Sequence, residues 1–151
     1  MEDKYKTYKK LATTVGVHFF VMYALAYVVI NSITDAYWFS TRPLYMALVM
    51  VAPMVILMLA FMGNMYQDNR LNTILYLGSG LVFVLAFSFI RTQAFVGDEM
   101  FLKSMIPHHS GAITVCQEAN ITDLEIEELC DEIVKAQKDE IDQMKQILER
   151  L

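Results

Sequence analysis

Two adjacent histidines, His108 and His109, have the residue type and spacing that best fit metal chemistry in this sequence. On a helix, Met105 lies one turn before His109, so a thioether and an imidazole would share a face. Neutral imidazole binds most late transition metals, and soft thioether sulfur adds a preference for copper. The alternative is that both rings lie on the water-facing side of an amphipathic helix. The surrounding sequence has to decide between these two interpretations.

Composition divides the chain into two parts of opposite character. Hydrophobic residues make up 56% of the 151 residues, above the roughly 45–50% typical of soluble domains. Residues 1–97 carry seven Lys or Arg and four Asp or Glu, net +3, whereas residues 98–151 carry five and thirteen, net −8. This division predicts a membrane anchor joined to a water-exposed module. The acidic module lacks a basic patch, which argues against nucleic acid as a partner.

Three apolar stretches are long enough to cross a bilayer, at residues 11–31, 43–63 and 71–90. A hydrocarbon core of about 30 Å needs about 20 residues of helix. The first stretch follows a lysine-rich head at residues 1–10, and it lacks the small-residue cleavage site of a removable signal peptide. The excess of lysine in the head predicts that the N-terminus is cytoplasmic and that residues 92–151 lie outside the cytoplasm.

The second apolar stretch contains a methionine at every fourth position: Met46, Met50, Met54, Met58 and Met62. Steps of four residues rotate by only about 40° around a helix, so the thioethers form one slowly winding ridge. Because thioethers select Cu(I), this ridge could be a path for metal through the membrane. It could equally be packing surface, which is the commoner role of methionine in apolar segments.

Residues 98–151 have the periodicity of two helices. The first carries a stripe at spacings of three and four residues: Phe101, Met105, His108, Ala112, Val115 and Ala119. Thr122 and Glu125 match a capping box, which predicts that the second helix begins with Thr122 as its N-cap. On that helix, Gln137 and Glu140 occupy positions where the spacing predicts apolar residues facing inward.

An antiparallel hairpin with its turn near Ile121 would bring the unusual residues of both helices to similar heights. Counting outward from the turn pairs Met105 with Gln137 and brings Asp98 level with Met144. A hairpin this short cannot cover its own core, because fewer than about 70–80 residues seldom suffice alone. We therefore expect a homo-oligomer, most simply a dimer whose two hairpins form a four-helix bundle with the polar groups inside.

The two cysteines, Cys116 and Cys130, fit neither a Cys-x-x-Cys motif nor a zinc-finger pair. They could form a disulfide between the two helices outside the cytoplasm, or they could remain free in the core. We predict free core thiols, because small buried cysteines are common.

The segment from Asp98 to Met144 resembles the bacterial family called domain of unknown function 305. The resemblance rests on Met105-Ile106-Pro107-His108-His109 and on the downstream Ala136-Gln137, Glu140-Ile141 and Met144. The family is described as ferritin-like and helical, and some members are periplasmic copper-binding proteins linked to copper tolerance. The resemblance implies Met105, His108, His109 and Met144 as candidate ligands, with Asp98, Gln137 and Glu140 as further candidates. Many relatives carry a longer or doubled soluble region, so a single hairpin implies that a second subunit completes the site.

Together these observations predict an all-α protein of the bacterial inner membrane, with three transmembrane helices followed by an extracytoplasmic, ferritin-like half-bundle. The expected function is metal binding, copper first, in sequestration or homeostasis. Two alternatives are a copper transporter or channel component that uses the methionine ridge, and an oligomerising membrane protein without metal. We do not expect an enzyme, because the Glu-x-x-His pairs of di-iron carboxylate bundles are absent from the sequence.

Overall fold

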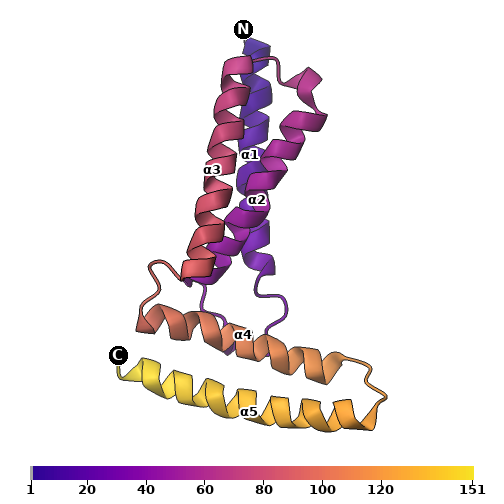
Figure 1. Cartoon of the computed structure of the whole chain (residues 1–151), viewed down its shortest axis with the longest axis vertical. Coiled ribbons are helices and arrows are strands. Elements are labelled where there is room, and N and C mark those ends of the chain that lie inside the picture. Colours follow the sequence, from indigo (N-terminus) through magenta and orange to yellow (C-terminus); the bar gives the residue numbers. More distant parts are fainter. Residues whose placement is uncertain (1) are drawn as a thin grey trace. The chain divides into compact units, whose positions relative to one another are not determined.

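The computed structural model describes residues 2–151, with side chains from Tyr5 onward, and every regular element in that range is helical. Helices α1 (Glu2–Leu25), α2 (Thr41–Phe61) and α3 (Asn69–Thr92) precede α4 (Asp98–Glu118) and α5 (Leu124–Glu149) (Figure 1). Two short 3-10 turns, η1 (Ile33–Asp35) and η2 (Gly63–Met65), lie in the connections. The predicted all-α fold is confirmed.

The chain divides into two units, which we describe separately. The three-helix unit contains residues 2–25 and 42–94, and the hairpin unit contains residues 26–41 and 95–151. Within the three-helix unit, α2 and α3 are long and apolar enough to cross a membrane, with mean hydropathies of 2.5 and 2.1. In the most apolar stretch of each helix, only 6% of the residues of α3 and 33% of those of α2 are buried.

The first predicted span, residues 11–31, is wrong at its C-terminal end. Helix α1 ends at Leu25, and residues 26–31 leave the helix and belong to the hairpin unit. The Tyr27 side chain is 5% exposed, and its hydroxyl donates a hydrogen bond to the Tyr37 carbonyl at 2.6 Å. Its ring also packs on Trp38, with centroids 4.7 Å apart. These contacts compete with continuation of the helix, and the apolar run therefore splits between two units.

Residues 2–10 of the lysine-rich head form the first part of α1, which is tied to the turn between α2 and α3. The Tyr8 hydroxyl donates to Asn72 Oδ1 at 2.7 Å, and the Asn72 amide donates to the Tyr66 carbonyl at 2.7 Å. Nearby, Leu11 of α1 packs in one buried cluster with Leu59 of α2 and Tyr66. The N-terminal half of α1 is thus held to the turn between α2 and α3 by both apolar packing and hydrogen bonds.

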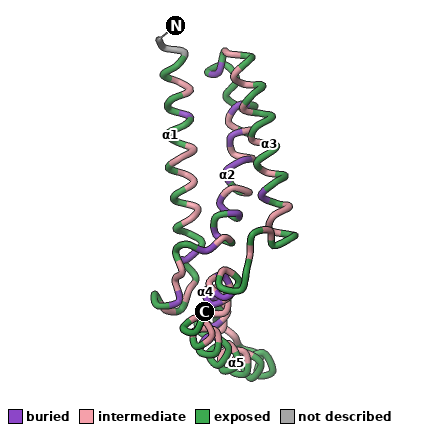
Figure 2. The backbone as a smooth tube through the Cα atoms, turned by 90° about the vertical axis from the view of Figure 1, so that its left-hand side faces the viewer, coloured by how far each residue is buried: buried purple, intermediate pink, exposed green. Residues whose placement is uncertain are grey.

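In the hairpin unit, α4 and α5 pack antiparallel around buried isoleucines. Ile106 and Ile113 of α4 form a cluster with Ile141 of α5, and Ile106 has no exposed surface. The outer side of α5 is largely exposed (Figure 2). Helix α4 continues through Pro107. The N-cap of α5 is Asp123, whose carboxylate accepts from the Glu125 and Ile126 backbone N–H groups, so the predicted Thr122 cap is wrong by one residue.

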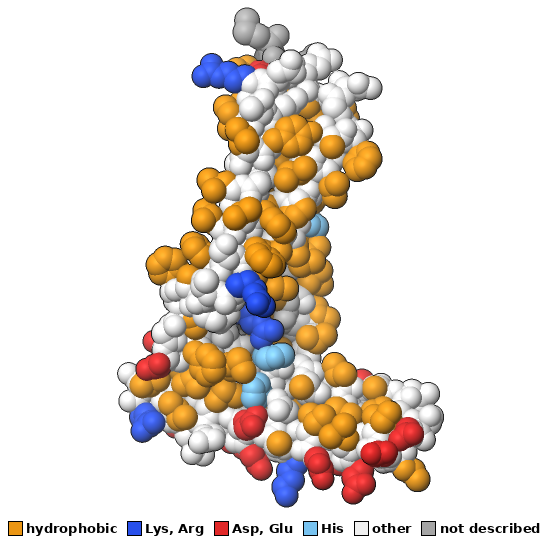
Figure 3. All heavy atoms as spheres, viewed as in Figure 1, with side chains coloured by type: hydrophobic (Ala, Val, Ile, Leu, Met, Phe, Trp, Pro, Cys, Tyr) orange, Lys and Arg blue, Asp and Glu red, His pale blue; other side chains and the backbone are white. Residues whose placement is uncertain are grey.

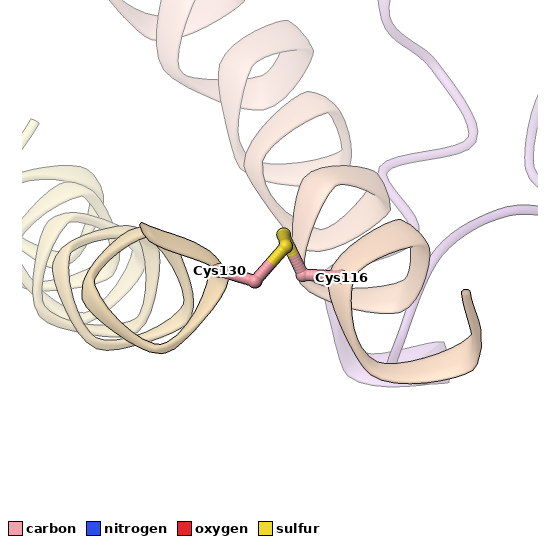
Figure 4. Close-up of a disulfide and its surroundings, with 2 residues drawn as sticks. All are labelled: Cys116 and Cys130. Atoms are coloured by element: carbon pink, nitrogen blue, oxygen red, sulfur yellow. A yellow bond between two sulfur atoms is a disulfide. The ribbon is translucent and has the colours of Figure 1, made fainter. Parts of the chain in front are cut away.

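Cys116 of α4 and Cys130 of α5 form a disulfide (Figure 4). Their Cα atoms are 5.3 Å apart, within the range that a disulfide spans. The prediction of free core thiols is therefore wrong. Each cysteine lies on the face of its helix that meets the other helix near the turn, where neither is deeply enclosed by core residues.

The predicted pairing of residues across the hairpin is also wrong, by one to two helical turns. The disulfide pairs Cys116 with Cys130, and His109 lies beside Glu140, whereas a symmetric turn places His109 near Ile133. The cause is the connection between the helices, where Ala119 and Asp123 have extended backbone. Helix α5 therefore begins beyond the end of α4, and Leu124 in its first turn is 80% exposed.

Residues 26–41, which we call the 26–41 segment, form a further layer on the hairpin. The Asn31 backbone N–H donates to the buried Ser110 hydroxyl at 2.8 Å, and its amide donates to Gln117 Oε1 at 2.8 Å. Asp35 Oδ1 lies 2.6 Å from Lys145 Nζ of α5. The hairpin is therefore held by a segment that precedes it by some sixty residues or more in the sequence.

Candidate metal-binding site

His109 of α4 and Glu140 of α5 lie together across the hairpin. His109 Nδ1 is 2.9 Å from Glu140 Oε2, and their side chains are 16% and 50% exposed. The distance fits an ion pair when the ring is protonated, but the directions of the groups do not meet the geometry of a hydrogen bond. Among the described residues, this buried nitrogen has no hydrogen-bond partner.

Gln137, one turn before Glu140 on α5, extends this polar group. Its Nε2 donates to Glu140 Oε2 over a long 3.4 Å, so the same carboxylate oxygen faces both the amide and the imidazole. Gln137 and Glu140, the polar residues that interrupt the apolar stripe of α5, thus lie in one group with His109. The sequence identified the polar positions, and the structure shows which histidine they meet.

Met105 and Met144 lie one helical turn to the same side of the His109–Glu140 pair. Met105 precedes His109 by four residues on α4, and Met144 follows Glu140 by four on the antiparallel α5. One turn of helix advances about 5.4 Å. Both thioethers are half-buried, and Met144 packs against the isoleucine core. Imidazole and thioether groups are therefore stacked in two adjacent layers.

His108 points differently from its neighbour. The two rings have centroids 6.1 Å apart and planes at 76°, and His108 is exposed while His109 is half-buried. Successive residues on a helix are about 100° apart in direction. The two imidazoles of the predicted site thus lie on different faces of α4.

Asp98 does not join the other candidates. It is exposed in the first turn of α4, eleven residues before His109, or about 16 Å along the helix. The shifted hairpin register also removes the predicted pairing of Asp98 with Met144. The described residues contain no group of three or more His, Cys, Asp or Glu side chains placed to hold a metal ion.

Comparison with known proteins places the chain in a family. Residues 88–148 match the family model described as domain of unknown function (DUF305). An uncharacterized protein of Acanthamoeba polyphaga mimivirus is 36% identical over 107 residues, which cover 70% of this chain and 68% of that protein. The chain belongs to the domain of unknown function 305 family. No solved structure matches it significantly. The family segment contains every candidate ligand on the hairpin, and the resemblance stated from the sequence is confirmed.

The methionine ridge of this family member lies outside the family segment, with four of its methionines on α2 and Met62 directly after the helix. Met46 and Met50 are 43% and 51% exposed, and Met62 is 42% exposed. The buried side of α2 is formed instead by residues other than methionine: Pro43, Tyr45, Ala47, Val51, Ala52, Val55 and Leu59. Met58 packs beside the cluster around Leu59. A metal path along this ridge would therefore need further copies or partners to enclose it.

Sequence reasoning missed one buried ion pair in the hairpin unit. Asp35 is 5% exposed and contacts Lys145, which lies 110 residues later in the chain. An open cavity of about 480 Å³ adjoins this pair and is lined by Thr34, Tyr37, Glu99, Lys103, Lys145, Leu148 and Glu149. Hydrophobic periodicity cannot predict this contact, because η1 is a single turn and is not part of a repeating pattern.

Proposed function

We propose that this member of the domain of unknown function 305 family binds a transition metal ion, copper first, on its hairpin and holds it for sequestration or homeostasis. The observation that carries the proposal is the buried Nδ1 of His109, which faces Glu140 without a hydrogen bond. An unsatisfied buried polar atom costs about 1–3 kcal/mol. A metal ion that accepts the nitrogen lone pair would remove this cost.

The chemistry of the neighbouring side chains fits copper. His109 would supply an imidazole nitrogen, and Met105 and Met144 would supply soft thioether sulfur, a combination that suits copper better than zinc. Glu140 and Gln137 would orient the imidazole and balance the charge of the cation. Such a site binds and releases an ion as cargo, so we propose binding rather than catalysis.

We further propose that α1, α2 and α3 lie in a membrane with the N-terminus in the cytoplasm. An apolar helix in the core of a water-soluble protein would be largely buried, yet only 6% of the most apolar stretch of α3 is buried. Uncovered apolar surface of this extent requires lipid or a partner. Hydrophobic side chains are spread over the three-helix unit, whereas acidic side chains gather on α5 (Figure 3). A bacterial inner membrane stays a prediction.

The disulfide supports an extracytoplasmic hairpin, because disulfides persist in oxidising compartments and are rare in the cytoplasm. We therefore expect Cys116 and Cys130 to be unreactive toward a membrane-impermeant maleimide on intact cells. In a Cys116→Ser variant, the remaining Cys130 thiol should be labelled from outside without lysis. Labelling of that thiol only after lysis would contradict the proposed orientation, and labelling of both native thiols in intact cells would contradict the disulfide.

The metal proposal is tested by metal content in full-length protein purified in detergent after growth with copper. We expect near-stoichiometric copper in the parent and a loss of about tenfold or more in His108→Ala/His109→Ala, the scale of losses seen when metal sites are perturbed. His18 is the third histidine of the chain and lies on α1. His18→Ala therefore serves as the matched control and should retain copper. Retention of the disulfide in each variant checks that the hairpin still folds.

The other outcomes separate the remaining hypotheses. Equal copper in parent and double variant would move binding to the methionines of α2 and favour a transporter. A Met50→Leu/Met54→Leu variant would then lose the metal. The proposed function would be contradicted if no sample contained metal and added Cu(I) or Cu(II) left the melting temperature unchanged. That result would favour a structural role.

A further inference from the structure

The 26–41 segment distributes its side chains in the opposite way to a water-facing loop. Asp35 and Ser40 are buried, with 5% and 2% of their surface exposed. Ile33 and Phe39, close to them in sequence, are 73% and 91% exposed. Water favours the reverse arrangement, because exposing large apolar side chains and burying a carboxylate both cost free energy. Asp35 is the only charged residue of the segment, so its exposed surface is uncharged and rich in large apolar side chains.

The chain passes between its two units at three points, and each point carries an exposed apolar side chain. Val28 lies three residues after the end of α1, Phe39 two residues before the start of α2, and Phe95 three residues after the end of α3. These side chains are 69%, 91% and 81% exposed. Because α1, α2 and α3 alternate in direction (Figure 1), all three points belong to the same face of the proposed membrane. Apolar side chains at such a face are in position to enter lipid.

The charged residues near these points also fit a lipid surface. Arg42 lies in the first turn of α2 and Arg91 in the last turn of α3, and both are exposed. Arginine binds phosphate through paired N–H donors, so the two residues fit the level of the lipid headgroups. Residues 98–151 carry five Lys or Arg and thirteen Asp or Glu, so charge does not draw the hairpin to anionic lipid. Its attachment would come from uncharged, apolar surface, which the 26–41 segment supplies.

We propose that the exposed apolar side chains of the 26–41 segment, with Ile33 and Phe39 foremost, enter the headgroup region of a lipid bilayer and dock the hairpin on the membrane surface. The segment connects lipid to both helices of the hairpin, because Asn31 is bonded to α4 and Asp35 to α5. A hairpin held in this way cannot turn freely above the membrane. The inference rests on the proposed membrane placement of α1, α2 and α3, and it is independent of metal binding.

Trp38 provides the test, because it is the only tryptophan of the chain and lies within the segment. Its ring is 46% exposed and packs on that of Tyr27. Full-length protein without copper is reconstituted in phosphatidylcholine nanodiscs, in which both membrane faces are open to water. We expect lipid brominated in the upper part of its acyl chains to quench Trp38 fluorescence strongly and aqueous iodide to quench it weakly, because interfacial apolar groups enter about 5–10 Å into this boundary.

Two paired variants show whether the apolar side chains themselves hold the segment in lipid. In Ile33→Ser/Phe39→Ser, the ratio of inserted to water-exposed segment should fall by about tenfold or more, so iodide quenching of Trp38 rises and lipid quenching falls. Both side chains are largely exposed, and retention of the disulfide checks that the hairpin still folds. Leu124→Ser/Leu129→Ser, at positions of α5 that are 80% and 52% exposed, is the matched control and should leave Trp38 quenching unchanged.

Failure of this inference differs from failure of the membrane proposal. Protein that does not co-elute with the nanodiscs would overturn both. Protein that co-elutes, but whose Trp38 is quenched by iodide and not by brominated lipid, would retain the membrane helices and reject the docking. Lipid quenching that persists in Ile33→Ser/Phe39→Ser would also overturn the docking, because Trp38 would then lie near lipid only through its place in the chain. An equal change in Leu124→Ser/Leu129→Ser would reject the assignment of the docking surface to the 26–41 segment.

Discussion

Lys145→Met is expected to destabilise the hairpin unit by about 3 kcal/mol. The substitution removes the partner of a buried carboxylate, and breaking a buried pair in this way typically costs about 3–5 kcal/mol. The lower end applies because the Lys145 side chain is 33% exposed, although Asp35 keeps only 7% of its side chain in contact with solvent. Hydrogen exchange of the α4 and α5 amides in detergent, at fixed pH and salt, measures the change.

The double variant separates lost pairing from lost packing. Asp35→Asn/Lys145→Met removes both charges, so it should recover at least half of the stability that Lys145→Met loses. Lys138→Met is the matched control, since it removes an exposed lysine from the same helix and should change stability by less than about 0.5 kcal/mol. Equal protection in parent and Lys145→Met would show that the 26–41 segment contributes little to the hairpin.

The helices themselves could largely be predicted from the sequence. Helix α4 begins at Asp98, as predicted, and α3 extends the predicted span of residues 71–90 by two residues at each end. Long apolar runs and regular spacing determine such elements locally, with Asp68 adding an N-cap to α3 through its carboxylate. Boundaries set by local chemistry are those that the sequence shows best.

The start of the 26–41 segment could not be predicted, because residues 26–30 match the apolar run before them. Residues 26–30 are as apolar as the end of α1, yet they leave the helix where Tyr27 bonds to Tyr37, ten residues on, and Asn31 bonds to α4. Ser110, which accepts from Asn31, follows it by 79 residues. Contacts of this kind depend on the folded unit and leave no periodic pattern in the chain.

The sequence offered candidate residues on both helices of the hairpin but did not predict which of them meet. Helix α4 carries two stripes with the same spacings, displaced by one residue. The first is Phe101, Met105, His108, Ala112 and Val115, and the second is Leu102, Ile106, His109, Ile113 and Cys116. Periodicity identifies both and does not decide which one faces α5. The structure assigns the second stripe to the hairpin core, so His109 meets Glu140 while His108 remains on the exposed side. The adjacent histidines are thus divided between two surfaces.

Ile106→Ala is expected to destabilise the hairpin unit by about 3–4 kcal/mol, within the range of about 2–5 kcal/mol for truncating buried isoleucine. Ile106 lies inside the Met-Ile-Pro-His-His motif, has no exposed surface and packs with Ile113 and Ile141. The candidate ligand Met105 directly precedes it, and the candidate ligands His108 and His109 follow within three residues, so the motif combines packing and binding in one short stretch. The loss of protection in α4 and α5 is measured by hydrogen exchange in the full-length protein.

Two further variants distinguish a packing role from a role in the metal site. Ile106→Val removes one methylene and should cost about 0.5–1.5 kcal/mol, and Ile126→Ala, at a position 50% exposed, should cost less than Ile106→Ala. If Ile106 acts only through packing, copper content should follow the stability of the hairpin across these variants. Copper lost from Ile106→Val while amide protection is kept would contradict this, and would show that the motif positions its ligands through the shape of this one side chain.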